Sequence, residues 1–342
     1  MNRPRKHPRF ALANAARLVL AGLLAFLTML STTACGDFED PTIVIDMRIL
    51  AITVDPPEVV SKVDPMNPTD LELVDVEVCA LVADPADARS LHFEMVACAP
   101  SDEGRCASDV TFAPITIGDV EDPETADAPV RMCGTLEGNA RLVPVIQEAI
   151  EGDSLSGFGG VPVQIDFFAR PADATLEQAV FGTKSILYSP KIPEERVANA
   201  NPTLEQITVT RVATEEELVL PIGRCKDITP IEVAPGEVLN LLPVEPDGAR
   251  EDYVVPTFDG GSRMFTENLR YSWFGTEGSD WEKGGTGGPK DFAGNEPKLD
   301  TDWRATQDPE KIGTGLDVSV WVVQRDERGG AAWFESCLRI VP

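Results

Sequence analysis

The feature that most constrains the fold is a pattern of alternating residues that occurs twice along the 342-residue chain. In residues 91–96 and again in 269–274, large apolar side chains recur at every second position, which is the period of a half-buried β-strand. Two further pairs of segments correspond in the same order, 161–167 with 316–322 and 181–190 with 334–342. Short strands separated by turns predict sheets packed face to face. We therefore predict an all-β chain of two tandem β-sandwich domains.

The repeat also sets the expected domain boundaries. We place the first sandwich at residues 42–190 and the second at residues 204–342. The segment between them, 191–203, is polar and contains prolines, which is typical of a linker.

Two local features are expected within the first sandwich. Residues 144–151 (PVIQEAIE) predict one short helix, with Asn139 available to cap it and Gly152 placed to end it. Residues 42–54 are rich in β-branched side chains, and their apolar phase changes near Ile49. This change predicts a bulged edge strand.

The N-terminus has the three parts of a signal peptide: a basic start, an apolar run and small residues before a cysteine. The apolar run, Leu18–Leu30, has thirteen residues, whereas a membrane-spanning helix needs about 20. The alternative is an anchor helix that is never removed. The sequence Leu30-Ser-Thr-Thr-Ala-Cys35 resembles the lipobox of bacterial lipoproteins. That resemblance implies that residues 1–34 are removed, that Cys35 is lipidated, and that residues 35–41 form a tether to the membrane.

The residue after the cysteine bears on localisation. In lipoproteins of this kind, an aspartate directly after the cysteine often retains the protein at the inner membrane. Here Gly36 holds that position and Asp37 follows it. The resemblance therefore favours a lipid anchor in the outer membrane, and leaves open whether the chain faces the periplasm or the cell surface.

Charge limits the partners. Removal of residues 1–34 takes away five of the 29 Lys and Arg and none of the 57 Asp and Glu, so the net charge changes from −28 to −33. A surface of this charge repels nucleic acid and anionic lipid head groups. We expect no nucleic-acid partner, and contact with the membrane only through the lipid anchor.

Six cysteines follow Cys35, and an exported chain meets an oxidising compartment. Cys225 and Cys337 are the only two in the second repeat, so they are expected to pair. The other four allow three connectivities. A short polar loop favours Cys98–Cys106, which leaves Cys79–Cys133, with Cys79 on the strand face that carries acidic residues. A zinc site is the alternative, but the chain has no C-x2–4-C pair and His92 is the one histidine after the signal peptide.

Two strands of the second repeat carry a family resemblance. Tyr271-Ser272-Trp273 stands in its middle strand, and its paired strands end in the turn 324–330 (QRDERGG). These segments resemble the immunoglobulin-like domains of bacterial surface proteins, especially PKD-type domains, although 274–278 (FGTEG) lacks the aspartates that follow the PKD tryptophan. The resemblance implies immunoglobulin-like sandwiches. The layout is also similar to uncharacterised outer-membrane lipoproteins of Gram-negative bacteria, which bring no known activity.

Several catalytic or metal-binding motifs fail in detail. His92 lies on the outward face of its strand without a nucleophile motif such as G-x-S-x-G. The segment 284–291 (GGTGGPKD) has a proline before its lysine and an aspartate where a phosphate-binding loop needs a hydroxyl, so we read it as a flexible loop. The acidic segment 119–127 (DVEDPETAD) could share a calcium ion, but it matches no EF-hand and is expected to be a solvated loop.

All five tryptophans lie in the second repeat. Trp273 shares its phase with Leu269 and Tyr271 and is expected in the core. Trp281 and Trp303 fall in a loop-rich region, where an indole could contact a ligand such as a sugar. The alternative is that both fold back onto their own sandwich.

These observations favour a lipid-anchored cell-envelope protein that acts as a non-catalytic binding or structural module, with no cofactor and no metal. Its expected partners are other envelope proteins or polysaccharide. The alternative is a carbohydrate-binding accessory protein or a carboxylate-dependent hydrolase that uses loops of the second domain. A cleft that gathers carboxylates and an exposed indole would distinguish that alternative.

Overall fold

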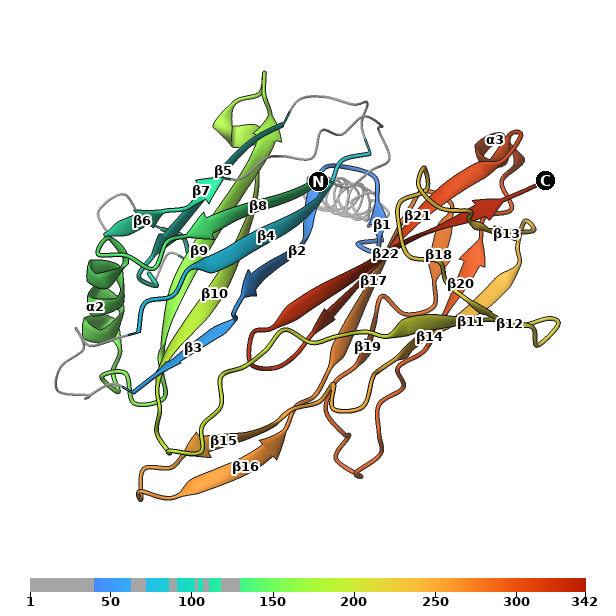
Figure 1. The fold of residues 1–342 in the computed structure, drawn as a ribbon. Helices are drawn as coiled ribbons and strands as arrows, with labels where there is room; N and C mark the ends of the chain where they lie inside the picture. Colours follow the sequence, from blue (N-terminus) through green and yellow to red (C-terminus); the bar gives the residue numbers. More distant parts are fainter. Residues whose placement is uncertain (1–39, 63–71, 86–90, 102–103, 107–110, 118–129) are drawn as a thin grey trace, which may run out of the picture. The chain divides into compact units, whose positions relative to one another are not determined.

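Short β-strands make up nearly all of the regular structure, as the repeat predicts (Figure 1). The computed structural model describes residues 40–62, 72–85, 91–101, 104–106, 111–117 and 130–342. Residues Thr42–Pro342 form one compact unit. Within the described ranges, we find no helix whose length and apolar character would let it cross a membrane.

In the described parts of the first half, the elements are short strands with one helix and one 3-10 turn. In chain order they are β1 (Ile43–Val44), β2 (Arg48–Asp55), β3 (Glu58–Ser61), β4 (Val76–Ala83), β5 (Leu91–Cys98), β6 (Phe112–Pro114), β7 (Thr116–Ile117), β8 (Val130–Leu136), α2 (Leu142–Gly152), β9 (Val161–Pro171), η2 (Leu176–Gln178) and β10 (Val180–Pro190).

The second half has more strands and one very short helix. Its elements are β11 (Gln206–Arg211), β12 (Glu217–Val219), β13 (Ile231–Val233), β14 (Val238–Val244), β15 (Asp252–Pro256), β16 (Ser262–Thr266), β17 (Arg270–Thr276), β18 (Ser279–Trp281), β19 (Gly285–Gly287), β20 (Thr301–Ala305), α3 (Pro309–Ile312), β21 (Leu316–Arg325) and β22 (Ala331–Ile340).

Both halves arrange their matching strands in the same order. One sheet of the first half runs β3-β10-β9-β5, and the corresponding sheet of the second half runs β13-β22-β21-β17. The short edge strands β3 and β13 pair in parallel with β10 and β22, while the longer strands pair antiparallel. The opposite sheets contain β2-β4-β8 and β11-β14-β20. This is the two-sheet arrangement of immunoglobulin-like sandwiches, so the predicted fold class is confirmed.

The predicted edge strand at residues 42–54 is divided in two. β2 carries the register shift of a bulge between Ile49 and Ala51, which confirms the bulge. β1 leaves this sheet and pairs in parallel with Gly275 and Thr276 of β17, in the second half. The chain thus contributes one short strand to the second sandwich before it builds the first, and the boundary at residue 42 stays a prediction.

The predicted helix is present as α2, and it begins two residues earlier than expected. Its N-cap is Arg141 rather than Asn139, although the Asn139 side chain accepts a hydrogen bond from the Arg141 N–H (2.8 Å). Gly152 is its last residue, as predicted. Its apolar side packs on the first core through Leu142, Val145, Ile146 and Ala149.

Each sandwich has its own apolar core, and a third cluster lies between residues of the two halves. The first core contains Phe167 and Met132, and the second contains Trp273 and Trp303. The third gathers Leu50 and Leu81 of the first half with Trp321 and other residues of the second. Burying this apolar surface stabilises the joined sandwiches.

Cys79 shares the strand phase of Leu81, on the face of β4 opposite to the first core, as predicted. That face is buried as well, and Cys79 is 2% exposed. The third cluster covers Leu81 on the same face, which is why β4 does not show the half-exposed pattern that its sequence predicts.

Candidate functional site

A pocket of about 450 Å³ lies in the second sandwich, along β22. Its walls are largely apolar and come from Pro202, Leu204, Ile222, Val322, Trp333 and Phe334. Its polar groups include Thr203, Gln324 and Glu335. A mostly apolar concavity of this size with a few polar groups is the usual form of a small-molecule site.

The strand pattern explains why these side chains meet. Val322 pairs with Phe334, and Gln324 pairs with Ala332, on the core-facing side of the β21–β22 hairpin. Trp333 and Glu335 alternate to its other side. The edge strand β13 pairs only with residues 338–340 of β22, so the preceding part of β22 is covered by two loops instead. One loop is held by a hydrogen bond from the Gly223 N–H to the Glu335 carbonyl (2.8 Å).

Gln324 has a determined orientation and an unsatisfied oxygen. Its Nε2 donates to the carbonyl of Thr203 (3.3 Å) and to the hydroxyl oxygen of Tyr271 (3.2 Å). The Thr203 carbonyl can only accept, so a flip of the amide that swaps Oε1 and Nε2 would break this hydrogen bond. Its Oε1 has no hydrogen-bond partner, although the side chain is 1% exposed. Buried acceptors without a donor are rare in folded proteins.

Trp333 is the one tryptophan of the five that is not buried, since the other four are at most 5% exposed. Glu335, two residues further on the same side of β22, accepts a hydrogen bond from Nε1 of Trp321 (3.2 Å). The pocket lining thus places an indole and a carboxylate on one side of β22 and the buried amide of Gln324 on the other.

Trp281 and Trp303, the ligand-contact candidates from the sequence, lie in the second core instead. They are 5% and 0% exposed, and they stand opposite each other on β18 and β20. Residues 279–281 and 301–305 are strands rather than loops, and their alternation turns both indoles inward. Neither side chain is available to stack on a ligand, so the prediction of ligand contact was wrong for both and the alternative of self-packing holds.

The sequence carries one weak signal for this pocket. Trp333 and Phe334 are adjacent aromatic residues on one strand, so one of them has to leave the core face. Phe334 lies on the core face of β22 and is 6% exposed, and Trp333 lies on the opposite face. No sequence signal marks Gln324, because its role depends on the carbonyl of Thr203, which lies 121 residues away along the chain.

Three disulfides are present, and they join the cysteines that the sequence analysis pairs: Cys79–Cys133, Cys98–Cys106 and Cys225–Cys337. Cys79 and Cys133 are direct partners on β4 and β8. With Glu77 they form the one cluster of potential metal ligands among the described residues, but both sulfurs are engaged in the disulfide and offer no thiolate.

The remaining sequence candidates have different outcomes. Cys35 and the acidic segment 119–127 lie outside the described residues. His92 is exposed and contacts Glu94 (2.9 Å) on the same side of β5. The segment 284–291 is not a loop throughout, because β19 within it pairs with residues 270–272 of β17.

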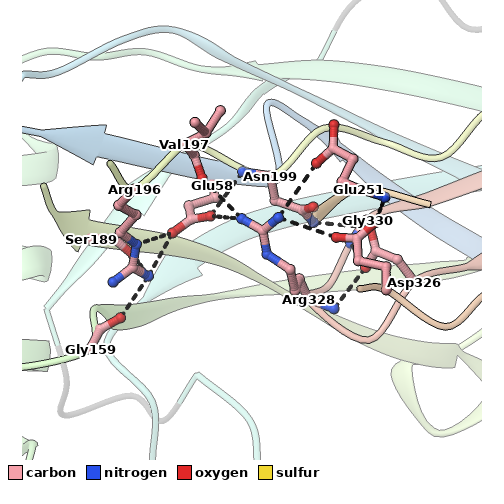
Figure 2. Close-up of polar contacts among 11 residues, drawn as sticks. Glu58, Gly159, Ser189, Arg196, Val197, Asn199, Glu251, Asp326, Arg328 and Gly330 are labelled. Carbon is pink, nitrogen blue, oxygen red and sulfur yellow. Dashed lines mark hydrogen bonds and ion pairs between the residues drawn. The ribbon is translucent and has the colours of Figure 1, made fainter. Parts of the chain in front are cut away.

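A buried polar network, shown in Figure 2, joins residues of the two halves. At its centre is Glu58 of β3, which is 1% exposed. Its Oε1 accepts from Arg196 (2.7 Å), and its Oε2 accepts from Arg328 (2.7 Å) and from the Asn199 N–H (2.9 Å). Burial acts to raise the pKa of Glu58, but the hydrogen bond of Ser189 and the charge of Arg196 outweigh it and hold the pKa below its ordinary value.

Arg328 is the residue that links the two halves of this network. Besides Glu58, it donates to Glu267 Oε1 (3.2 Å) and to Glu251 Oε2 (3.4 Å) on the base of the β15–β16 hairpin. Its guanidinium also lies 4.8 Å from the ring centre of Tyr253 on that hairpin. One cation therefore connects three segments that are distant in the sequence.

The pKa of Glu267 is shifted in the opposite direction from that of Glu58. The Glu267 side chain is 2% exposed, and it accepts from the Glu251 N–H (3.3 Å) as well as from Arg328. Burial and the nearby charge of Asp326 raise the pKa of Glu267 to about 7, despite the attraction of Arg328. Asp326 holds the turn of the β21–β22 hairpin by accepting from the backbone N–H groups of Arg328 (2.9 Å) and Gly330 (2.7 Å).

Comparison with known proteins identifies no family for this chain. No family model matches the chain, and no curated protein matches it at a significant level. Similar solved structures include a partial N-terminal region of an enterococcal surface protein, with 7% identity, 89% of this chain and 98% of that chain covered, and a TM-score of 0.25. The sialic acid binding region of a Streptococcus sanguinis adhesin is 12% identical, with a TM-score of 0.22. The match covers 88% of this chain and 78% of that chain.

A DUF4785 family protein from Legionella pneumophila is similar at 6% identity and a TM-score of 0.22, with 84% of this chain covered. The chain spans 56% of the length of that protein. Identities and scores this low do not bear on function.

Proposed function

We propose that the chain is a lipid-anchored protein of the cell envelope that acts as a non-catalytic binding or structural module. The observation that carries this proposal is the junction of the two sandwiches. The network of Glu58 and Arg328 and the apolar cluster around Trp321 hold residues of both halves together. A unit joined by buried contacts presents its surfaces in a constant arrangement, which suits a scaffold or a receptor.

The proposed anchor is the lipidated Cys35, in the outer membrane. Support comes from the thirteen-residue apolar run, too short to span a bilayer, and from Gly36 after the cysteine. Several acyl chains on Cys35 would hold the chain at the membrane without a spanning helix. Residues up to Pro41 would then separate the sandwiches from the lipid.

The anchor is tested by growing cells with an alkyne-tagged fatty acid and comparing the native chain with the Cys35→Ser variant. We expect the label and the outer-membrane fractionation in the native chain alone. The Ser31→Ala variant is the matched control, since it changes a hydroxyl nearby and keeps the thiol. Label on Cys35→Ser, or a native chain that keeps residues 1–34, would contradict the anchor.

The module role is tested by cross-linking in intact cells that express the native chain or Cys35→Ser, followed by mass spectrometry. We expect the anchored chain to give defined cross-links to envelope components that the unanchored variant does not give. The purified chain is also incubated with isolated envelope polysaccharide. Soluble fragments released in proportion to protein concentration and time would indicate turnover and would favour the hydrolase alternative.

A further inference from the structure

We propose that two copies of the chain associate through the outer edge of β16. Their β16 strands pair antiparallel about a two-fold axis at Met264, so that the two β15–β16 hairpins form one continuous sheet. The inference names an interaction surface and its partner, a second copy. It goes beyond the proposed function and does not depend on the lipid anchor.

The outer edge of β16 carries backbone groups that are open to a partner. β16 pairs with β15 alone, and all five of its residues are exposed (Figure 1). The Thr257 N–H donates to the Gly261 carbonyl (3.0 Å), which sets the phase of the ladder. Ser262, Met264 and Thr266 therefore point their N–H and C=O groups outward. These outward groups bond to no described part of the chain, and such an edge is a template for strand pairing.

The opposite edge of the hairpin is less suited to self-pairing. Pro256 lies on the outer edge of β15 and has no N–H to donate. Asp252 lies on the same edge, and two copies of an acidic chain repel each other where carboxylates meet. β16 contains neither a proline nor an acidic residue. The composition of the two strands therefore selects the β16 edge.

The side chains of β16 match themselves when the strand is reversed. With Met264 on the two-fold axis, each Met264 lies beside its own copy, and Ser262 of one chain lies opposite Thr266 of the other. Serine and threonine hydroxyls in such a pair can hydrogen-bond, and Met264, which is 73% exposed, becomes covered. On the other face, Arg263 lies opposite Phe265, where a guanidinium can pack on the ring. A register shifted by two residues would place Met264 opposite a hydroxyl residue instead.

Contacts near both ends of the hairpin hold the edge in place. Near the base, Tyr253 stacks on Phe265 with 5.6 Å between the ring centres, and its hydroxyl donates to Glu327 (3.0 Å). At the tip, Phe258 stacks on Phe158 of the first half, with 5.4 Å between the ring centres. A strand that is ordered before it pairs loses less conformational entropy in the complex.

The association is expected to be weak and to depend on salt. Two strands of five residues bury less surface than a standard protein interface. Each copy also has a net charge of −28, and salt screens the resulting repulsion. We expect a dissociation constant on the order of 100 μM in solution, with tighter association at higher salt.

The first test is sedimentation equilibrium of the full chain carrying Cys35→Ser, at up to about 500 μM and at salt from about 0.05 to about 0.5 M. Met264→Pro should weaken the dimer by at least about tenfold, because it removes an outward N–H at the two-fold axis and leaves the β15–β16 ladder intact. Val254→Pro is the matched control. It makes the same change on the outer edge of β15 and should dimerise like the parent chain.

The second test traps the pairing and does not require a proline in either strand. Met264→Cys and Val254→Cys are each made in the Cys35→Ser chain, whose other cysteines are in disulfides. Residues paired at the two-fold axis lie about 5.5 Å apart between Cα atoms, within reach of a disulfide. With oxidised glutathione present, Met264→Cys should form disulfide-linked dimers, and Val254→Cys should stay monomeric.

The proposal is overturned by any of four results. The parent chain is monomeric at about 500 μM, which is also the result if the edge pairs only with a different protein. Salt dissociates the dimer. Met264→Pro dimerises as tightly as Val254→Pro. Met264→Cys forms disulfide-linked dimers no faster than Val254→Cys. None of these results bears on the label or the cross-links of the anchored chain, so the proposed function would stand.

Discussion

Replacing Glu267 by glutamine is expected to remove a loss of stability that the native chain shows between about pH 5 and about pH 8. The side chain is 2% exposed, and burial and the charge of Asp326 raise its pKa from 4.5 to about 7. Glutamine has nearly the same shape as the protonated acid, and its oxygen can still accept from the Glu251 N–H. Its NH2 group only donates, so it cannot accept from Arg328 as Glu267 Oε1 does, and this contact is lost at every pH. The pH dependence of the comparison therefore comes from the absent charge alone.

The sign follows from proton binding. Because the pKa is higher in the folded chain, the folded state holds the proton more tightly than the unfolded state between 4.5 and about 7. The stability that Glu267 contributes is fully present below pH 4.5, the pKa in the unfolded chain. It is lost as the pH rises through about 7, the pKa in the folded chain. A displacement of the pKa from 4.5 to about 7 corresponds to at most about 3.4 kcal/mol, of which about 2.5 kcal/mol is lost between pH 5 and pH 8.

The assay is urea unfolding of the native chain and Glu267→Gln at about pH 5 and about pH 8. Relative to the native chain, the variant should gain up to about 2.5 kcal/mol in free energy of unfolding when the pH is raised from about 5 to about 8. Glu205→Gln, at an exposed position, is the control and should show no such change. A difference between variant and native chain that does not depend on pH would refute the reasoning.

Three further predictions concern the junction and the cores. Arg328→Met should lower the free energy of unfolding by about 3 kcal/mol, because buried Glu58 would lose one of its two cationic partners. The same urea assay measures this loss, and a value below about 1 kcal/mol would contradict the prediction. Replacing Cys225 and Cys337 together by alanine should lower the free energy of unfolding by about 4 kcal/mol, since their disulfide closes a loop with a separation of 112 residues. Thermal unfolding without reductant measures the change in stability, and an unchanged midpoint would contradict the loop-closure explanation. Trp303→Ala should cost about 3 to 5 kcal/mol by leaving a cavity in the second core. The same urea assay measures it, and a loss below about 1 kcal/mol would contradict the placement of Trp303 in the core.

Much of the sheet order could be predicted from the sequence because the alternation is local. Each matching pair of strands, such as β9 with β21, shows its own two-residue period and its own turn. The disulfide pairing could also be predicted from the sequence, because the division of the cysteines between the two repeats and the length of the loops between them left few possible pairings. The placement of Trp281 failed for a related reason: its strand has three residues, too short for a period to be seen.

The alternation of apolar residues and the positions of the cysteines by themselves determine two disulfide-bonded sandwiches, because strand period and chain spacing are properties of short segments. Only the tertiary structure decides where β1 pairs, how Arg328 reaches Glu58 and that Gln324 lines a pocket. These features depend on contacts between groups such as Arg328 and Glu58, which are 270 residues apart in the chain. The energy of such a contact comes from burial and exact distance, and neither quantity is encoded in any single segment of the sequence.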